Sequence, residues 1–337
     1  MNRLEQDLRA RFGARLRTGA PLAELTSFRI GGPADVLLEV ENEDELRAAM
    51  AAAWCERAPA FCLGAGTNLL VSDRGVRGLV VRLGQGFTHL EFDGMQVRAG
   101  AAAQFGTLVH DAIERGLKGL EFGEGIPGSV GGGLVMNAGA FGGEIARVVR
   151  LVHGVNEQGQ ALALSGAEVK FSYRRTELPP RFVITRVDFE LERGDREQLR
   201  ARVGELKAKR AARQPRGLPN AGSIFKNPPG NFAGRLLESA GLKGARMGAA
   251  AFSTEHARRT GRRTGRTSLS CSSSTTGSAL RRRSGSVPGW WTSRGRYPRP
   301  RRAIYRSASR SASTGRRREL TVSPDAPGPR AIAGPGD

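Results

Sequence analysis

Two glycine-rich segments constrain this chain more than any other feature of its 337 residues. The first runs from Leu63 to Leu70 after a short apolar stretch, and the second runs from Gly125 to Gly133. Successive glycines let backbone N–H groups converge on one point and let a ligand approach the main chain. A pyrophosphate suits such a loop, because convergent amides stabilise its charge without a lysine.

Neither segment is a P-loop, because neither contains Gly-Lys-Ser/Thr, and neither is a GxGxxG motif that opens a Rossmann helix. Either segment taken alone is more typical of a tight turn than of a nucleotide site. Two such loops in one domain favour a dinucleotide held between them.

The rest of the pattern predicts mixed helices and strands. We expect helices at 2–17, 43–57, 102–116 and 195–213, and strands at 35–40, 79–83, 90–98, 146–156, 160–164 and 182–191. The absence of regular βαβ alternation favours an α+β class over a doubly wound sheet. The charged helix at 195–213 is expected to be a solvated linker to a further domain that begins near Pro215.

The net charge of +21 suggests a nucleic-acid or membrane-surface binder until its distribution is considered. Residues 257–337 hold 19 of the 53 basic residues and 3 of the 32 acidic ones, and they contain no Lys, Phe, Met or Asn. Such a segment buries too little apolar surface to offset chain entropy, so we expect a disordered tail. It is a basic arm, a low-complexity linker or, as the missing residue types favour, frameshifted coding sequence.

The remaining composition indicates an ordinary cytoplasmic protein without a metal site. Cys55, Cys62 and Cys271 form no CxxC pair and no metal-ligand spacing with the four histidines, and Cys55 and Cys62 are expected to be buried. The N-terminus has no signal-peptide pattern, and no run of about 18 apolar residues could span a membrane.

Five stretches in order resemble one enzyme family, the UDP-N-acetylenolpyruvoylglucosamine reductases. They are TSFRIGGPAD (26–35), LGAGTNLLVSDRGVRGLVV (63–81), GLEFGEGIPGSVGGGLVMNAGAFGGEI (119–145), FSYRRTELP (171–179) and PNAGSIFKNPPGNFAGRLLESAGLKGARMGAA (219–250). The resemblance covers about 20–256. It implies a vanillyl-alcohol-oxidase/PCMH-type FAD-binding domain of two subdomains (1–82 and 83–200), a partial α+β substrate-binding domain (201–256) and the tail (257–337).

The resemblance also implies an FAD site built from both glycine segments. The residues expected to hold the pyrophosphate are Gly64, Ala65, Gly66, Thr67, Asn68 and Leu69, and those expected to line the flavin are Ile126, Ser129, Gly131, Gly132, Val135 and Gly139. Some relatives in this fold attach flavin through His or Cys. Because the glycine motifs here contain neither residue, we expect non-covalent FAD.

The implied reaction reduces the enolpyruvyl group of UDP-N-acetylglucosamine enolpyruvate with NADPH. Negative charge builds beside the carboxylate, so the reaction needs a cation and a proton donor. By resemblance Arg174 is the active-site arginine, with Arg175 as its competitor by adjacency, and Ser223 is the proton donor. The expected substrate contacts are Tyr173, Lys226 and Asn227.

Two departures from the family pattern matter. Phe141 stands where relatives often carry a tyrosine, and the family's C-terminal glutamate has no match, because Glu319 lies in an unrelated context. Losing such a group typically costs about 10² to 10⁴ in rate, so the chain is expected to bind FAD and to be slow or inactive as a reductase.

Three alternatives remain open. One is another oxidoreductase of the same flavin fold, against which the GSIFKNP motif argues, and one is a flavin-binding pseudoenzyme. The third is a nucleic-acid-binding protein that uses the arginine tail, whose phosphate contacts would be non-specific and strongly salt-dependent.

Overall fold

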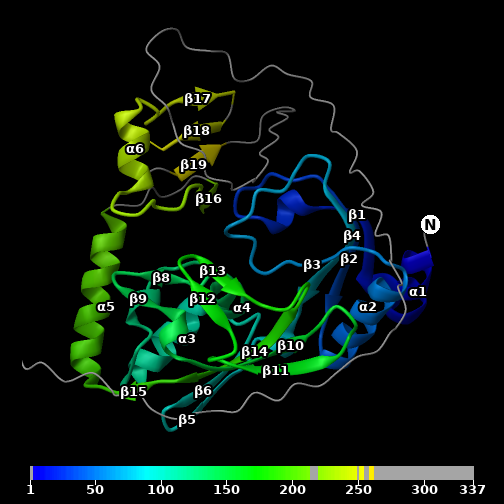
Figure 1. The fold of residues 1–337 in the computed structure, drawn as a ribbon, viewed down its shortest axis with the longest axis horizontal. Coiled ribbons are helices and arrows are strands. Elements are labelled where there is room, and N and C mark those ends of the chain that lie inside the picture. Colours follow the sequence, from blue (N-terminus) through cyan, green and yellow to red (C-terminus); the bar gives the residue numbers. More distant parts are fainter. Residues whose placement is uncertain (1–2, 213–218, 249, 254–257, 262–337) are drawn as a thin grey trace, which may run out of the picture. The chain divides into compact units, whose positions relative to one another are not determined.

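The computed structural model describes residues 3–212, 219–248, 250–253 and 258–261, all of which belong to one compact unit, Met1–Ser273 (Figure 1). In these residues α-helices and mostly antiparallel sheets are mixed, so the expected α+β class is confirmed. No helix among them is long and apolar enough to cross a membrane.

The N-terminal sheet has the strand order β1-β2-β4-β3, with β1 antiparallel to β2 and both other pairs parallel. Its strands are β1 (Leu16–Pro21), β2 (Pro33–Val40), β3 (Ala60–Cys62) and β4 (Val76–Leu83). Strand β2 is buried on both faces: Leu38 and Val40 pack in a core with α2 (Glu43–Cys55), whereas Leu37 packs on the opposite side. Asn42 caps α2 by accepting a hydrogen bond from the Glu45 amide at 2.9 Å.

The first helix is shorter than its apolar spacing predicts. Helix α1 is Arg3–Phe12, and Gly13 follows with a φ of +56°. A left-handed glycine ends a helix readily because it has no Cβ. The expectation of a helix to residue 17 is therefore wrong, since the 3-10 turn η1 (Gly13–Arg15) and strand β1 occupy that stretch.

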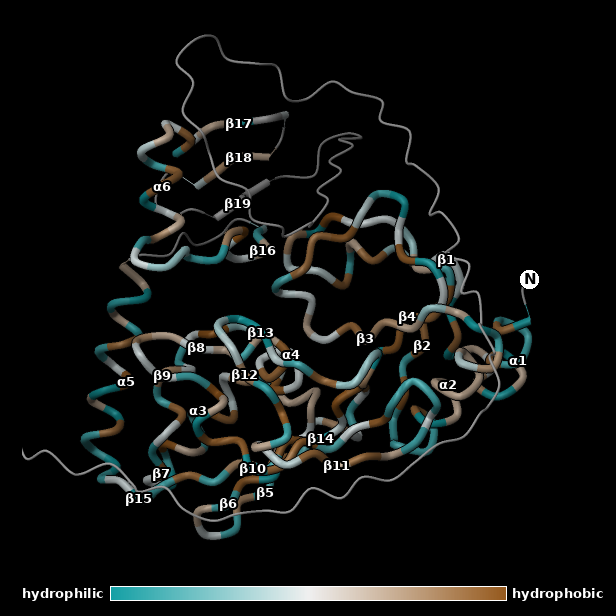
Figure 2. Tube along the Cα trace, in the orientation of Figure 1, coloured by the Kyte–Doolittle hydropathy of each residue, from teal (hydrophilic) through white to brown (hydrophobic). Residues whose placement is uncertain are grey.

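The second sheet is entirely antiparallel, in the order β11-β10-β14-β6-β5. Its strands are β5 (Leu90–Asp93), β6 (Gln96–Gly100), β10 (Val149–Val155), β11 (Ala161–Ser165) and β14 (Val183–Glu190). Helices α3 (Phe105–Glu114) and α4 (Val130–Val135) belong to the same core as Val152, Val187 and Phe189 of this sheet (Figures 1 and 2).

Three two-stranded ribbons and several 3-10 turns complete this region. The ribbons are β7 (Leu117–Lys118) with β15 (Glu192–Arg193), β8 (Gly139–Ala140) with β9 (Gly143–Glu144), and β12 (Lys170–Ser172) with β13 (Arg175–Glu177). The remaining 3-10 turns are η2 (Leu22–Leu25), η3 (Gln85–Phe87), η4 (Glu121–Gly123) and η5 (Ile145–Arg147).

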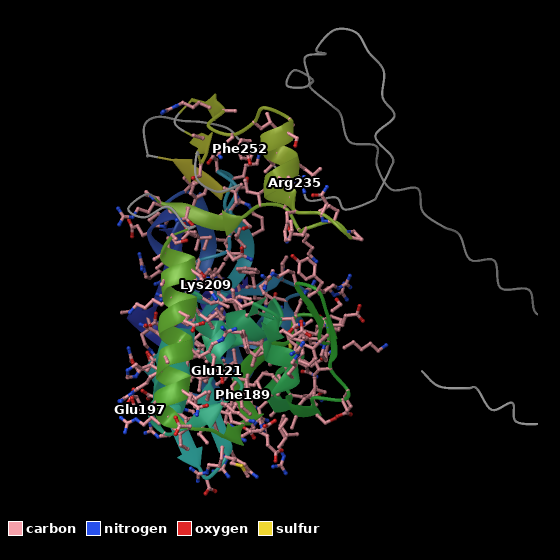
Figure 3. All side chains as sticks on the ribbon, turned by 90° about the vertical axis from the view of Figure 1, so that its left-hand side faces the viewer. Glu121, Phe189, Glu197, Lys209, Arg235 and Phe252 are labelled. Carbon is pink, nitrogen blue, oxygen red and sulfur yellow. The ribbon has the colours of Figure 1, made fainter. Side chains whose placement is uncertain are left out.

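Helix α5 (Arg196–Ala211) is exposed along most of its length, as the sequence predicted, but apolar side chains on one face also pack against the protein. Leu199 and Leu206 are buried on one face, and Val203 packs between them against the core that contains α3. On α3, Glu114 accepts hydrogen bonds from Arg196 and Arg200. Figure 3 shows α5 along its length, from Glu197 near one end to Lys209 near the other. The domain boundaries at 82, 200 and 256 stay predictions.

The last described part is a sheet in the order β16-β19-β18-β17 with one helix. Its elements are β16 (Asn220–Ser223), α6 (Ala233–Ser239), β17 (Arg246–Met247), β18 (Ala250–Phe252) and β19 (Arg258–Gly261). Strand β19 pairs with both β16 and β18, so the tail expected from residue 257 is wrong at these four residues. The rest of the expected tail, 262–337, lies outside the described residues, as does Cys271.

Candidate functional site

Both glycine segments line one cavity of about 1700 Å³. Typical small-molecule sites occupy roughly 300 to 1,000 Å³, so this cavity has room for a dinucleotide and a second ligand. Every site residue expected from the sequence lines it: Gly64, Ala65, Gly66, Thr67, Asn68, Leu69, Ile126, Ser129, Gly131, Gly132, Val135, Gly139, Tyr173, Arg174, Ser223, Lys226 and Asn227. The structure thus brings all of them to one place, and their individual roles stay predictions.

The first glycine loop begins directly after β3 and folds against the 25–27 segment. Gly66 has a φ of +65°, and its carbonyl accepts a hydrogen bond from the Ser27 amide at 3.1 Å. A Cβ on Gly66 would lie 2.1 Å from the Leu25 carbonyl oxygen. Glycine is therefore required here by both backbone conformation and close approach.

The two glycine segments touch each other. The Thr67 hydroxyl donates to the Pro127 carbonyl at 3.3 Å, and a Cβ on Gly64 would lie 3.0 Å from the Ser129 hydroxyl. Ser129 starts α4, where its Oγ accepts from the Gly132 amide at 3.3 Å. Because glycine has no side chain, both segments expose main chain to the same cavity. This is the arrangement expected for binding a dinucleotide.

The charges that line the cavity also suit a ligand with phosphate groups. Among the described residues two acidic ones line it, Glu39 and Glu238, and they pair with Arg82 at 3.1 Å and Lys243 at 2.9 Å. Four further basic residues among the described ones line it: Arg174, Lys209, Arg210 and Lys226. The lining is therefore net positive. With the glycine cradle, this excess makes the residues present a fit for FAD.

Arg174 lies in the two-residue turn between β12 and β13 and has a φ of +56°. It is half-buried, and its guanidinium lies 5.6 Å from the centre of the Tyr173 ring. Arg175, its competitor, is exposed, pairs with Glu177 at 3.3 Å and does not line the cavity. The turn thus directs these adjacent arginines to different surroundings.

The GSIFKNP motif contributes a further part of the cavity wall and contacts the Arg174 turn. Ser223 ends β16 and is exposed toward the cavity, and Lys226 Nζ donates to the Tyr173 carbonyl at 3.3 Å. The Asn227 side-chain oxygen accepts from the Ala233 amide at 3.0 Å at the start of α6. Asn227 therefore has its amide group left for a ligand, while its oxygen holds the helix.

Sequence reasoning missed Lys209 and Arg210, which reach the cavity from the last turn of α5. Arg210 Nη1 donates to the Gly125 carbonyl at 3.4 Å, and its guanidinium lies 5.7 Å from the Phe141 ring centre. The spacing of Leu199, Val203 and Leu206 predicts that one face of α5 is buried. That pattern could have indicated that α5 packs against the protein, so that its last turn reaches other residues.

Two cysteines fall among the described residues, and the expectation that both are fully buried is wrong for both. Cys55 is exposed on α2, whereas Cys62 is half-buried and lines the cavity. Burial raises the pKa of the Cys62 thiol to about 12, so it stays protonated at neutral pH. No cluster of three or more His, Cys, Asp or Glu residues with metal-binding geometry occurs in the described part of the chain.

Comparisons with known proteins agree with this geometry. Residues 34–165 match the family model described as FAD binding domain, and residues 214–267 match that described as UDP-N-acetylenolpyruvoylglucosamine reductase, C-terminal domain. The expected FAD-binding domain is confirmed.

Similar proteins carry the same description. UDP-N-acetylenolpyruvoylglucosamine reductase 2 of Symbiobacterium thermophilum is 47% identical over 72% of this chain and 79% of its own length. The reductase of Caldanaerobacter subterraneus is 43% identical over 72% and 80%. A crystal structure of the Thermus caldophilus reductase aligns with a TM-score of 0.64 at 38% identity, covering 73% of this chain and 86% of that one.

Proposed function

This chain belongs to the UDP-N-acetylenolpyruvoylglucosamine reductase family, and from that premise we propose that it reduces UDP-N-acetylglucosamine enolpyruvate to UDP-N-acetylmuramate with NADPH. It is an FAD-dependent oxidoreductase of peptidoglycan precursor synthesis. We place it in the cytoplasm, where NADPH and nucleotide sugars are available. One observation carries the proposal: the family's motif residues, from four separate stretches of sequence, line a single net-positive cavity.

FAD, when bound, supplies hydride transfer from NADPH to the enolpyruvyl double bond. The loop from Gly64 to Leu69 and the segment from Ile126 to Gly139 are the residues that would hold it. We propose that it is held without a covalent bond. Among the described lining residues, Cys62 is the only cysteine and no histidine occurs, and a protonated thiol is a poor nucleophile.

Arg174 would stabilise the charge that develops on the substrate. When hydride adds to the terminal methylene carbon, electron density moves to the adjacent carbon and its carboxylate. A guanidinium is permanently charged and can donate two parallel hydrogen bonds to a carboxylate. The half-buried position of Arg174 reduces solvent screening of this interaction, which strengthens it.

Ser223 would complete the reduction by donating its hydroxyl proton to the carbon beside the carboxylate. The new C–H bonds replace the double bond, and the serine oxygen is left negative until it takes a proton from solvent. Lys226, three residues on and on the same wall, would stabilise that charge. Tyr173 would contact the substrate from the β12–β13 hairpin, where its carbonyl accepts from Lys226.

The test is NADPH oxidation by the FAD-loaded full chain with and without the enolpyruvyl sugar. We expect oxidation that depends on this sugar and falls by about 10² to 10³ in Arg174→Ala, the range for removal of one charge-stabilising donor. Arg175→Ala is the matched control and is expected to keep its rate. Equal losses in both variants would contradict the assignment of Arg174.

A second candidate, an FAD-binding protein with very slow turnover, is favoured by the weak packing of the GSIFKNP region. Helix α6 buries only Ala233 among its residues, and Phe225 and Phe232 are 53% and 68% exposed. The family's C-terminal glutamate has no counterpart among the described residues, and Glu319 lies outside them. Under this candidate the chain would bind FAD normally and reduce the sugar about 10² to 10⁴ times more slowly than a complete reductase.

A further inference from the structure

Asn137 is a buried polar residue that lies behind the cavity rather than in its wall. The residue is 2% exposed, and it follows α4 with a φ of +39°. Asparagine tolerates this left-handed conformation at the end of a helix. Here its backbone N–H donates to the Leu134 carbonyl at 2.9 Å. The left-handed backbone conformation explains why asparagine is tolerated at this position, but it does not explain why its polar side chain is buried.

That side chain joins two other pieces of the chain, at Ser172 and at 144–146, to the end of α4. Its Nδ2 donates to the Ser172 carbonyl at 3.1 Å and to Glu144 Oε2 at 3.2 Å, and its Oδ1 accepts from the Ala146 amide at 3.2 Å. Both donor hydrogens are used and the acceptor is occupied, as a buried amide requires.

Each of these pieces leads directly to the cavity. Ser172 immediately precedes the turn that carries Tyr173 and Arg174. Glu144 belongs to β9, whose partner β8 contributes Gly139 to the wall. Asn137 itself follows α4, which contributes Gly131 and Gly132. One buried amide group thus connects the helix and the two hairpins that would hold flavin and substrate.

A second bond joins the Arg174 hairpin to the same helix end. The Thr176 hydroxyl donates to the Leu134 carbonyl at 2.5 Å. The β12–β13 hairpin is a separate two-stranded sheet with three residue pairs of its own. Isolated hairpins are marginally stable in water, so its position depends on such side-chain bonds.

From this arrangement we infer that Asn137 is a positioning residue, which with Thr176 fixes the Arg174 turn relative to the glycine helix α4. The inference rests on the proposed function for the role of Arg174. A reacting group displaced by about 1 Å loses on the order of 10² in rate, so the bond from Asn137 to Ser172 matters although neither side chain lines the cavity.

The first test is amide hydrogen exchange of the FAD-loaded full chain, which needs no activity. Asn137→Gly removes the side chain and keeps the left-handed backbone unstrained, and Thr176→Val removes only the hydroxyl bond. We expect exchange in 170–177 to quicken at least tenfold in both variants while helix α2 is unchanged. Unchanged exchange in the hairpin, or equal acceleration in α2, would overturn the inference.

The second test is a double-mutant cycle on kcat/KM for the enolpyruvyl sugar. Asn137→Gly is expected to lose about 10²-fold alone, to lose nothing further in the Arg174→Ala background, and to keep its full effect in the Arg175→Ala background. Additive losses with Arg174→Ala would overturn a role through Arg174. A wild-type chain that neither binds nor reduces the sugar would sink the proposed function, whereas the exchange result would still decide whether Asn137 fixes the hairpin.

Discussion

Replacing Gly66 by alanine tests the close approach of the first glycine loop to the backbone before it. The φ of +65° at Gly66 costs an alanine about 1 to 2 kcal/mol. The new Cβ would also lie 2.1 Å from the Leu25 oxygen and 2.9 Å from the Thr26 Cα. Backbone must therefore move by about 1 Å, and overpacking of this kind costs about 1 to 3 kcal/mol. We expect a total loss of about 2 to 5 kcal/mol in the free energy of unfolding.

Gly94 provides the matched control, because its φ is +60° and a Cβ there would meet nothing within 4 Å. Gly94→Ala should lose only the conformational part, about 1 to 2 kcal/mol. Urea denaturation of both FAD-free variants measures the difference, and titration with FAD should show at least tenfold weaker binding for Gly66→Ala alone. Equal destabilisation, or equal FAD affinity, would refute the argument from close approach.

Three further predictions concern the two described cysteines, two helix caps and the Glu114 carboxylate. Iodoacetamide at pH 8 should alkylate exposed Cys55 much faster than Cys62, whose thiol pKa is raised to about 12, and equal labelling by peptide mass spectrometry would contradict this. Ser129→Ala and Asn42→Ala each remove a helix cap and should lose about 1 kcal/mol of unfolding free energy, but only Ser129→Ala should weaken FAD binding. Hydrogen bonds from Arg200 and Arg196 lower the pKa of Glu114 to about 2 from its ordinary value near 4.5. These hydrogen bonds therefore add to the free energy of unfolding above the ordinary pKa of Glu114, and their contribution is lost as pH falls toward 2. The denaturation midpoints of wild type and Glu114→Gln should differ at pH 7 and become equal in acid.

Short-range patterns predicted the parts of this molecule that depend on local chemistry. The glycine loops and the start of α2 each depend on a few adjacent residues, and the cavity brings the two glycine loops together as the family resemblance implied. Strand β1 was missed because LRTGAP buries only Leu16 and Ala20, too few residues for an alternating pattern.

Other features depend on contacts that sequence order does not reveal. Helix α5 looks solvated because its apolar residues are few, yet Leu199, Val203 and Leu206 share one face and pack. Cys55 lies on the exposed side of α2, which its alanine-rich surroundings do not indicate. Strand β19 has an arginine-rich sequence and pairs through its backbone with β16 and β18.

The central claim is that FAD binds in this cavity and transfers hydride to an enolpyruvyl sugar. The most direct measurement is a single turnover: the FAD-loaded full chain is reduced anaerobically by NADPH and then mixed with UDP-N-acetylglucosamine enolpyruvate. We predict that the absorbance of oxidised flavin returns with formation of UDP-N-acetylmuramate, and that UDP-N-acetylglucosamine leaves the flavin reduced. A flavin that stays reduced with the enolpyruvyl sugar, or a protein that binds no FAD, would contradict the account.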